Sequence, residues 1–193
     1  IILAILGESG SGKSTVLRLI SGLELPEQGE IRINDLLVAS PVTFVPPEDR
    51  NVGMVFQDYA LFPHLTVAAN IGFGLNKLSK KDRDRRIQEV LELVDMLGFE
   101  KRYPHELSGG QQQRIALARA LAPQPEVLLL DEPFSNLDSS LQARIRSELK
   151  TILTRAGITA ILVTHDREDA RQVADQVVLM QNGEIKDIVK PEE

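Results

Sequence analysis

The chain has no cysteine, and none of its apolar runs approaches the about 20 residues that a membrane-spanning helix needs. The absence of cysteine excludes disulfides, thiolate metal sites and cysteine nucleophiles. Residues 1–6 are apolar but lack a basic start and a cleavage site, so they are not a signal peptide. Because they resemble a strand, we expect further sequence, including N-terminal strands, upstream of Ile1.

Positive charge is also scarce, since 22 lysines and arginines face 28 acidic residues and the net charge is −6. This balance argues against a general affinity for DNA, RNA or anionic lipid, and we expect no nucleic-acid partner. The charged run 80–86 mixes both signs, which indicates a solvated helix face. Hydrophobic residues at 42% suffice for one large domain, or one domain with an inserted subdomain.

Apolar segments of strand length alternate with segments of helical periodicity, which predicts an α/β fold with a mostly parallel sheet flanked by helices. Expected strands cover residues 1–6, 30–34, 52–56, 127–130, 158–163, 177–180 and 185–188, with a loop at 41–49. Expected helices cover 13–20, 111–121, the stretch that contains Leu141, Ile145, Leu149 and Ile152, and 168–174. Asn182-Gly183 predicts a hairpin between the last two strands.

Strand patterns disappear between residues 58 and 110, which we interpret as a helical insertion into the α/β core. Ser79 is placed to cap a helix there, and the apolar positions that follow have helical spacing. Those positions are Ile87, Val90, Leu91, Val94 and Leu97. The expected division is therefore an α/β core of residues 1–57 and 111–193 and a helical subdomain of residues 58–110.

Residues 7–14 match the phosphate-loop pattern G-x-x-x-x-G-K-[ST] between an expected strand and an expected helix. In this pattern Lys13 reaches the β- and γ-phosphates, the Ser14 hydroxyl ligates Mg²⁺, and Thr15 is placed for the α-phosphate. The predicted nucleotide-binding residues are Gly7, Glu8, Ser9, Gly10, Ser11, Gly12, Lys13, Ser14 and Thr15.

A second acidic feature lies at the end of the apolar strand 127–130, where Asp131 and Glu132 follow directly. Ligands of α/β sheets bind at the carboxyl ends of strands. Asp131 is therefore a candidate Mg²⁺ ligand, and Glu132 is a candidate general base for the attacking water.

A second glycine-rich turn, Leu-Ser-Gly-Gly-Gln at 107–111, precedes a helical pattern. Taken alone it would be a serine helix cap with flexible glycines. Between a phosphate loop and an Asp-Glu strand end, it makes the chain resemble the nucleotide-binding subunit of ATP-binding cassette (ABC) transporters over essentially its full length. That resemblance implies a P-loop NTPase fold, ATP and Mg²⁺ as ligands, and ATP hydrolysis.

The resemblance also assigns roles to three residues that carry no functional signal on their own. Taken alone, Gln57 would be a surface glutamine, His165 a capping or solvated histidine, and Asp138 a helix N-cap. Gln57 resembles the glutamine that links Mg²⁺ and the attacking water to the helical subdomain. His165 resembles the histidine that touches the γ-phosphate, and residues 135–138 with Asp138 resemble a loop that crosses the dimer interface. The implied catalytic residues are Glu132, His165, Lys13 and Gln57, and the implied metal-site residues are Ser14, Gln57 and Asp131.

The same resemblance implies three protein partners. A second ABC ATPase subunit would bind head to tail, with Ser108, Gly109, Gly110, Gln111 and Asp138 acting in trans on its ATP. Transmembrane permease subunits would dock near residues 59–67, where we expect Tyr59, Leu61 and Phe62 to face a groove in part. A solute-binding protein would complete an importer at the cytoplasmic face of the inner membrane.

Segments 59–67, 102–107 and 165–170 resemble bacterial importers of the iron, polyamine, sulfate and sugar group, with Arg167 closest to ferric iron importers. Such subunits carry an adenine-stacking aromatic before the phosphate loop and a regulatory domain after the cassette, neither of which falls within these residues. The alternative is a non-transport ABC ATPase acting on nucleic acid or ribosomes, which usually has tandem cassettes. A P-loop kinase or GTPase would leave 107–111 and His165 without a role.

Overall fold

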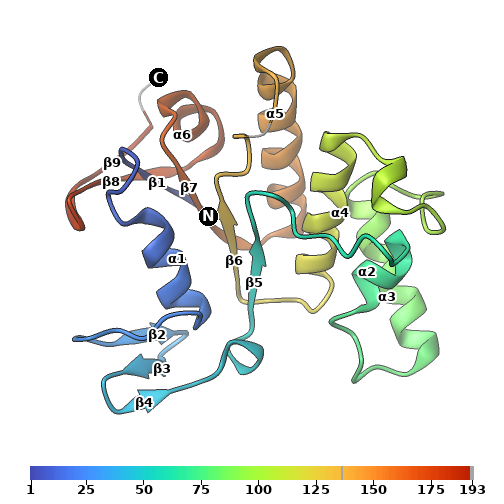
Figure 1. Ribbon diagram of the computed structural model, residues 1–193, viewed down its shortest axis with the longest axis horizontal. Coiled ribbons are helices and arrows are strands. Elements are labelled where there is room, and N and C mark those ends of the chain that lie inside the picture. Colours follow the sequence, from blue (N-terminus) through green and yellow to red (C-terminus); the bar gives the residue numbers. More distant parts are fainter. Residues whose placement is uncertain (136, 192–193) are drawn as a thin grey trace.

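The computed structural model describes residues 1–135 and 137–191, and it divides into a sheet-based part and a helical part (Figure 1). The strands are β1 (Ile2–Leu6), β2 (Ile31–Ile33), β3 (Leu36–Ser40), β4 (Thr43–Phe44), β5 (Val52–Val55), β6 (Val127–Asp131), β7 (Thr159–Thr164), β8 (Gln176–Gln181) and β9 (Glu184–Val189). The helices are α1 (Lys13–Ser21), α2 (Val67–Gly72), α3 (Lys80–Leu93), α4 (Gly109–Leu121), α5 (Ser139–Ala156) and α6 (Arg167–Val173), with short 3₁₀ turns at Pro47–Asp49 and Pro104–Glu106.

The main sheet has the strand order β5-β6-β7-β1-β8-β9. All of its neighbouring strands are parallel except the final pair, β8 and β9. That pair is the predicted hairpin, and Asn182 and Gly183 both have positive φ at its turn, at 50° and 78°. The predicted α/β fold with a mostly parallel sheet flanked by helices is therefore confirmed.

Both faces of the sheet are buried along its central strands β1, β6 and β7, as their sequences require. Along β6, Leu128 and Leu130 join the core on the face of α4, α5 and α6, whereas Leu129 joins the core on the face of α1. All three leucines have no exposed surface. This burial explains why β6 is an unbroken apolar run rather than an alternating one.

A small antiparallel sheet of β2, β3 and β4 accompanies the main sheet (Figure 1). Sequence reasoning missed β3, and the expected loop at 41–49 contains β4 and a 3₁₀ turn. The turn between β2 and β3 uses Asn34 and Asp35 in the left-handed region, with φ of 47° and 65°. Asparagine and aspartate tolerate that conformation. Because the turn contains no glycine, it lacks the usual sequence signal of a hairpin.

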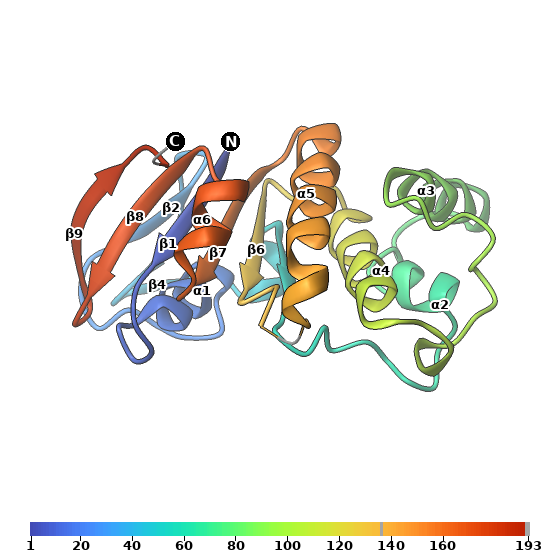
Figure 2. The ribbon, with the colours of Figure 1, turned by 90° about the horizontal axis from the view of Figure 1, so that it is seen from above.

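The helical part contains α2, α3 and the start of α4, and it extends to one side of the sheet (Figure 2). Ser79 caps α3 as predicted, because its Oγ accepts a hydrogen bond from the Asp82 N–H at 3.1 Å. Leu97 was expected on the buried face of this helix, but α3 ends at Leu93 and the Leu97 side chain is 51% exposed. Asp95 has φ of 56°, so the chain leaves the helical path before Leu97.

Helix α5 contains the expected apolar face, with Ile145, Leu149 and Ile152 buried. Leu141, expected on the same face, lies in the first turn of the helix and is 46% exposed. Helix α1 ends at Ser21, one residue beyond the expected range 13–20, and Gly22 with φ of 86° provides a left-handed C-cap. Across residues 1–135 and 137–191, no helix combines the length and the apolar character needed to cross a membrane.

Candidate functional site

Four parallel strands end at the same edge of the main sheet and bring several of the predicted site residues together. Leu6 at the end of β1 pairs with Thr164 at the end of β7, and Val163 pairs with Asp131 at the end of β6. Val55 at the end of β5 pairs with Leu130. The segments that follow these strands contain the phosphate loop, Gln57, Glu132 and His165.

Lys13 is the first residue of α1, directly after the loop that follows β1, and only 5% of its surface is exposed. Its Nζ donates hydrogen bonds to the carbonyl oxygens of Gly7 and Glu8, both at 2.8 Å. In the described part of the chain, no carboxylate lies within ion-pair distance of this ammonium group. A buried cation without a carboxylate partner suits an anionic ligand.

The phosphate loop depends on glycine at specific positions. A Cβ on Gly7 would lie 2.4 Å from the Met180 carbonyl oxygen and 2.6 Å from Ser11 Oγ. Gly12 has φ of 96° and is the N-cap of α1, which no side chain caps. The first N–H groups of α1 therefore lack a side-chain acceptor and can bind an anion at the positive end of the helix dipole.

Ser14 and Asp131 are adjacent although 117 residues separate them, and the Ser14 hydroxyl donates to Asp131 Oδ1 at 3.1 Å. A hydroxyl beside a carboxylate is an oxygen donor set that suits Mg²⁺, which takes one or two protein ligands and completes its shell with phosphate and water. No cluster of three or more His, Asp or Glu residues suited to a metal occurs in the described residues. Such a sparse donor set fits a metal that arrives with a nucleotide.

Glu132 and His165 form a close pair, with Nδ1 of His165 lying 2.7 Å from Oε2 of Glu132. The Glu132 backbone has φ of 47°, which is unusual for a residue other than glycine. Its N–H donates to the Val163 carbonyl at 3.1 Å, which anchors this conformation to β7. Strained backbone of this kind tends to occur at functional positions.

Gln57 follows β5 and reaches the same area, where its Nε2 donates to Ser135 Oγ at 3.0 Å. Ser135 Oγ in turn donates to the Glu132 carbonyl at 3.0 Å. Sequence reasoning did not assign this bridging role to Ser135. No local pattern signals it, because 78 residues separate it from Gln57.

The turn 107–111 begins α4 with a reciprocal capping box. Gln111 N–H donates to Ser108 Oγ at 3.3 Å, and Ser108 N–H donates to Gln111 Oε1 at 3.0 Å. Helix α5 lies between α4 and α1 in both views, so this turn is separated from the phosphate loop of its own chain (Figures 1 and 2). The exposed Asp138 is the N-cap of α5, and Asn136 of the expected interface loop lies outside the described residues.

The predicted docking segment 59–67 is only partly accessible. Leu61 and Phe62 are half-buried, but the expectation that Tyr59 faces a groove is wrong, because this side chain is 6% exposed. Its backbone has φ of 63°, and its carbonyl accepts a hydrogen bond from Arg119 at 3.0 Å. The turn thereby directs the Tyr59 ring into the core.

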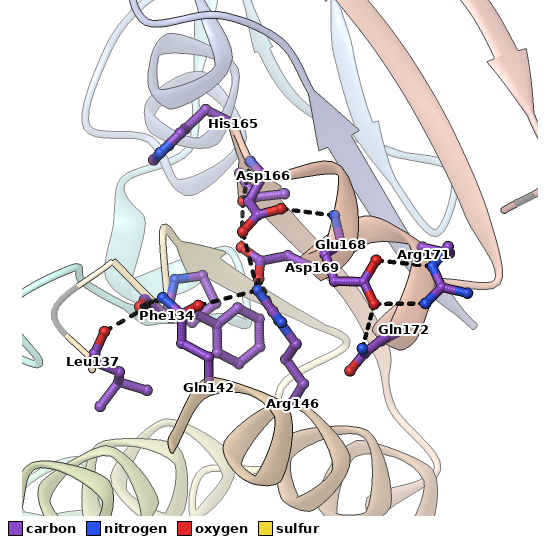
Figure 3. A network of polar contacts seen from close by, with 12 residues as sticks. Phe134, Leu137, Gln142, Arg146, His165, Asp166, Glu168, Asp169, Arg171 and Gln172 are labelled. Carbon is purple, nitrogen blue, oxygen red and sulfur yellow. Dashed lines mark hydrogen bonds and ion pairs between the residues drawn. The ribbon is translucent and has the colours of Figure 1, made fainter. Parts of the chain in front are cut away.

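Beside His165 lies a buried polar network that was not predicted from the sequence (Figure 3). Arg146 Nε donates to Asp169 Oδ1 at 2.6 Å, and Arg146 Nη2 donates to Asp166 Oδ2 at 3.0 Å. Thr164 Oγ1 donates to Asp169 Oδ2 at 2.6 Å. Burial raises the pKa of Asp169, and the hydrogen bonds from Thr164 and Arg146 oppose this shift. Twenty or more residues separate Arg146 from both acids, so no local pattern reveals the network.

The fold and the grouping of these segments define the chain as an ATP-binding cassette. The family model described as "ABC transporter" matches residues 1–135, and the chain belongs to this family. It is similar to a dimeric ATP-binding cassette solved in a post-hydrolysis state with ADP and Pi, with 34% identity and a TM-score of 0.79. The match covers 100% of this chain and 86% of that one.

Curated relatives are import ATP-binding proteins. The chain is 52% identical to the spermidine/putrescine protein PotA of Pseudomonas fluorescens, 50% to the sulfate/thiosulfate protein CysA of Caulobacter vibrioides and 50% to the Fe(3+) protein FbpC of Yersinia pestis. These matches cover 98%, 100% and 98% of this chain. They cover 51%, 57% and 54% of the relatives, so the chain spans about half of their length.

Proposed function

We propose that the chain is the ATP-binding and ATP-hydrolysing motor part of an ABC importer. The observation that carries this proposal is the meeting of Lys13, the Ser14–Asp131 pair and the Glu132–His165 pair at one edge of the sheet. ATP binding would use residues 7–15, with Lys13 near the β- and γ-phosphates. The uncapped N-terminus of α1 supplies further donors for these phosphates.

Ser14, Asp131 and Gln57 would hold Mg²⁺, which neutralises charge on the phosphates when bound. Glu132 would accept a proton from the attacking water as general base. His165, whose Nδ1 faces Glu132, would use the other edge of its ring toward the γ-phosphate. Gln57 would position the water, and its bridge through Ser135 ties it to the Glu132 turn.

A second copy would complete the active site. Residues Ser108, Gly109, Gly110, Gln111 and Asp138 are exposed or half-buried, and the turn 107–111 is separated from its own phosphate loop by α5. We therefore assign them to the ATP of the partner in a head-to-tail dimer. ATP then favours the closed dimer because it contacts both subunits there, and hydrolysis weakens that preference.

The remaining partners follow from the similarity to import proteins. Permease subunits would dock on the helical part, residues 58–110, near Leu61 and Phe62, and would hold the chain peripherally at the cytoplasmic face of the inner membrane. A solute-binding protein would deliver the substrate. We propose ferric iron as that substrate because segment 165–170 resembles that of ferric iron importers. The sequence identities to the polyamine, sulfate and Fe(3+) proteins are similar, so overall identity favours none of these substrates.

The enzymatic proposal is tested by measuring phosphate release from Mg-ATP by the wild type and Glu132→Gln. We expect the variant to bind ATP as the wild type does and to lose at least ~100-fold in turnover, since the general base is gone. Glu92→Gln, which changes an exposed acid on α3, is the control and should retain full activity. Turnover by Glu132→Gln at the wild-type rate would contradict the assignment.

A further inference from the structure

Helix α5 is the element that contacts both loops of the Glu132–His165 pair. One of these loops follows β6 and contains Glu132 and Phe134, and the other follows β7 and contains His165 and Asp166. Gln142, one turn before Arg146, donates through Nε2 to the Phe134 and Leu137 carbonyls, both at 3.4 Å. Arg146 reaches the other loop through Asp166 (Figure 3).

Arg146 is the residue that touches both loops with one side chain. Its guanidinium lies 5.9 Å from the centre of the fully buried Phe134 ring, two residues beyond Glu132. The same group binds Asp166, the residue that directly follows His165. Arg146 itself is 6% exposed, whereas the Asp166 side chain is 42% exposed, so only the Arg146 end of this bridge is shielded from solvent.

The same helix contacts the second glycine-rich turn. A Cβ on Gly110 would lie 3.0 Å from the Ile145 Cδ1 atom, so α4 and α5 are closely packed beside Ser108. Three residues after Gly110, Gln113 of α4 donates from Nε2 to the Pro133 carbonyl at 2.8 Å. A displacement of α4 is therefore expected to reach the Glu132 turn through Gln113 and the His165 loop through α5.

We propose that Arg146 is a positioning residue that holds the Asp166 loop against the Phe134 turn and thereby maintains the contact between Glu132 and His165. This inference rests on the proposed ATP hydrolysis, because it assigns Arg146 to the same site. Arginine is required because its planar group binds two carboxylates and presents a face to an aromatic ring at the same time. Lysine would keep the charge but not the two-sided contact.

Two mild variants test the proposal without emptying the buried site. Asp166→Asn weakens the ion pair between Arg146 and residue 166, next to His165, and leaves the Arg146–Asp169 pair in place. The asparagine keeps an oxygen that can cap α6 by accepting from the Glu168 N–H. Arg146→Lys retains the buried positive charge. Arg144→Lys, on the same helix but 73% exposed and paired with Glu148, is the matched control.

We expect Asp166→Asn and Arg146→Lys each to lower kcat by ~10-fold or more with an unchanged KM for ATP, because loss of orientation affects the chemical step. The double variant should be no slower than the slower single variant, since both act on one contact. Arg144→Lys should match the wild type. The proposal would be overturned if both single variants retained the wild-type kcat. It would also be overturned if their kcat fell only in proportion to the fraction of unfolded protein.

A readout without turnover separates this inference from the enzymatic one. The Nδ1–H proton of His165, assigned among the three histidines by His165→Ala, should give a downfield NMR signal when it donates to Glu132. We expect this signal in the wild type and Arg144→Lys, and its loss or shift in Asp166→Asn and Arg146→Lys. An unchanged signal in both single variants would refute the positioning role, whereas a wild type without ATPase activity would refute the proposed function.

Discussion

At the scale of single residues, the site combines a local sequence motif with contacts between residues that are far apart in the sequence. Local patterns were sufficient to predict the phosphate loop, because its spacing and its place between a strand and a helix are both local. They were insufficient for Ser135, Arg146 and Asp169, whose partners are distant in sequence. Only the folded sheet brings such residues together.

The Gly7 position offers a test of the loop's tight geometry. Gly7→Ala should lower the free energy of unfolding by ~1–3 kcal/mol, because the added methyl group meets the Met180 carbonyl, which cannot easily move. ATP affinity should fall in the same variant. Denaturant unfolding and nucleotide titration check both effects, and an alanine variant with wild-type values in both would contradict the description of the loop.

The exposed pair of Glu168 and Arg171 makes stability depend on acid pH. Hydrogen bonds from Arg171 and then Gln172 lower the Glu168 pKa from 4.5 to about 2. Because the folded-state pKa is lower than the unfolded one, this contribution is fully present above pH 4.5 and is lost as the pH falls toward 2. The Tm gap between wild type and Glu168→Gln should therefore shrink over that range. A gap that is constant from neutral to acid pH would contradict the assignment.

At the scale of elements, α4 connects the second glycine-rich turn to the segment after Gln57. Its N-terminus contains Ser108 and Gly109, and Arg119 near its C-terminus donates to the Ala60 carbonyl at 2.7 Å and the Tyr59 carbonyl at 3.0 Å. Both of these residues have positive φ, at 46° and 63°. Without this contact the turn would lose two hydrogen bonds from a charged donor and keep the backbone bond from the Tyr59 N–H to the Phe56 carbonyl at 2.9 Å. No local sequence pattern indicates this contact, because 59 residues separate Arg119 from Ala60 and 60 separate it from Tyr59.

Replacing Arg119 should therefore release the turn. Arg119→Met should cost about 2–3 kcal/mol of stability, because two carbonyls lose charged hydrogen bonds. Hydrogen exchange should increase at residues 58–62 more than elsewhere. Arg155→Lys, an exposed arginine paired with Asp95, is the control. Uniform exchange changes across the chain, or no loss of stability, would contradict a specific role for Arg119.

At the scale of the whole molecule, the phosphate loop and the turn 107–111 lie on opposite sides of α5 (Figure 2). The resemblance to ABC subunits predicts that the two segments serve different nucleotides, and the fold is consistent with that separation. A single chain then holds two half-sites, so ATPase activity per chain should rise with protein concentration until dimers dominate. Initial rates over a dilution series check this, and a constant specific activity would contradict it.

The mass of Glu132→Gln in solution tests whether a second copy completes the active site. With saturating ATP and Mg²⁺, light scattering should show a dimer, because the nucleotide is bound but not hydrolysed. Adding Ser108→Arg should return the protein to a monomer that still binds ATP. A Glu132→Gln variant that stays monomeric with ATP bound would contradict the account, and so would loss of ATP binding on adding Ser108→Arg.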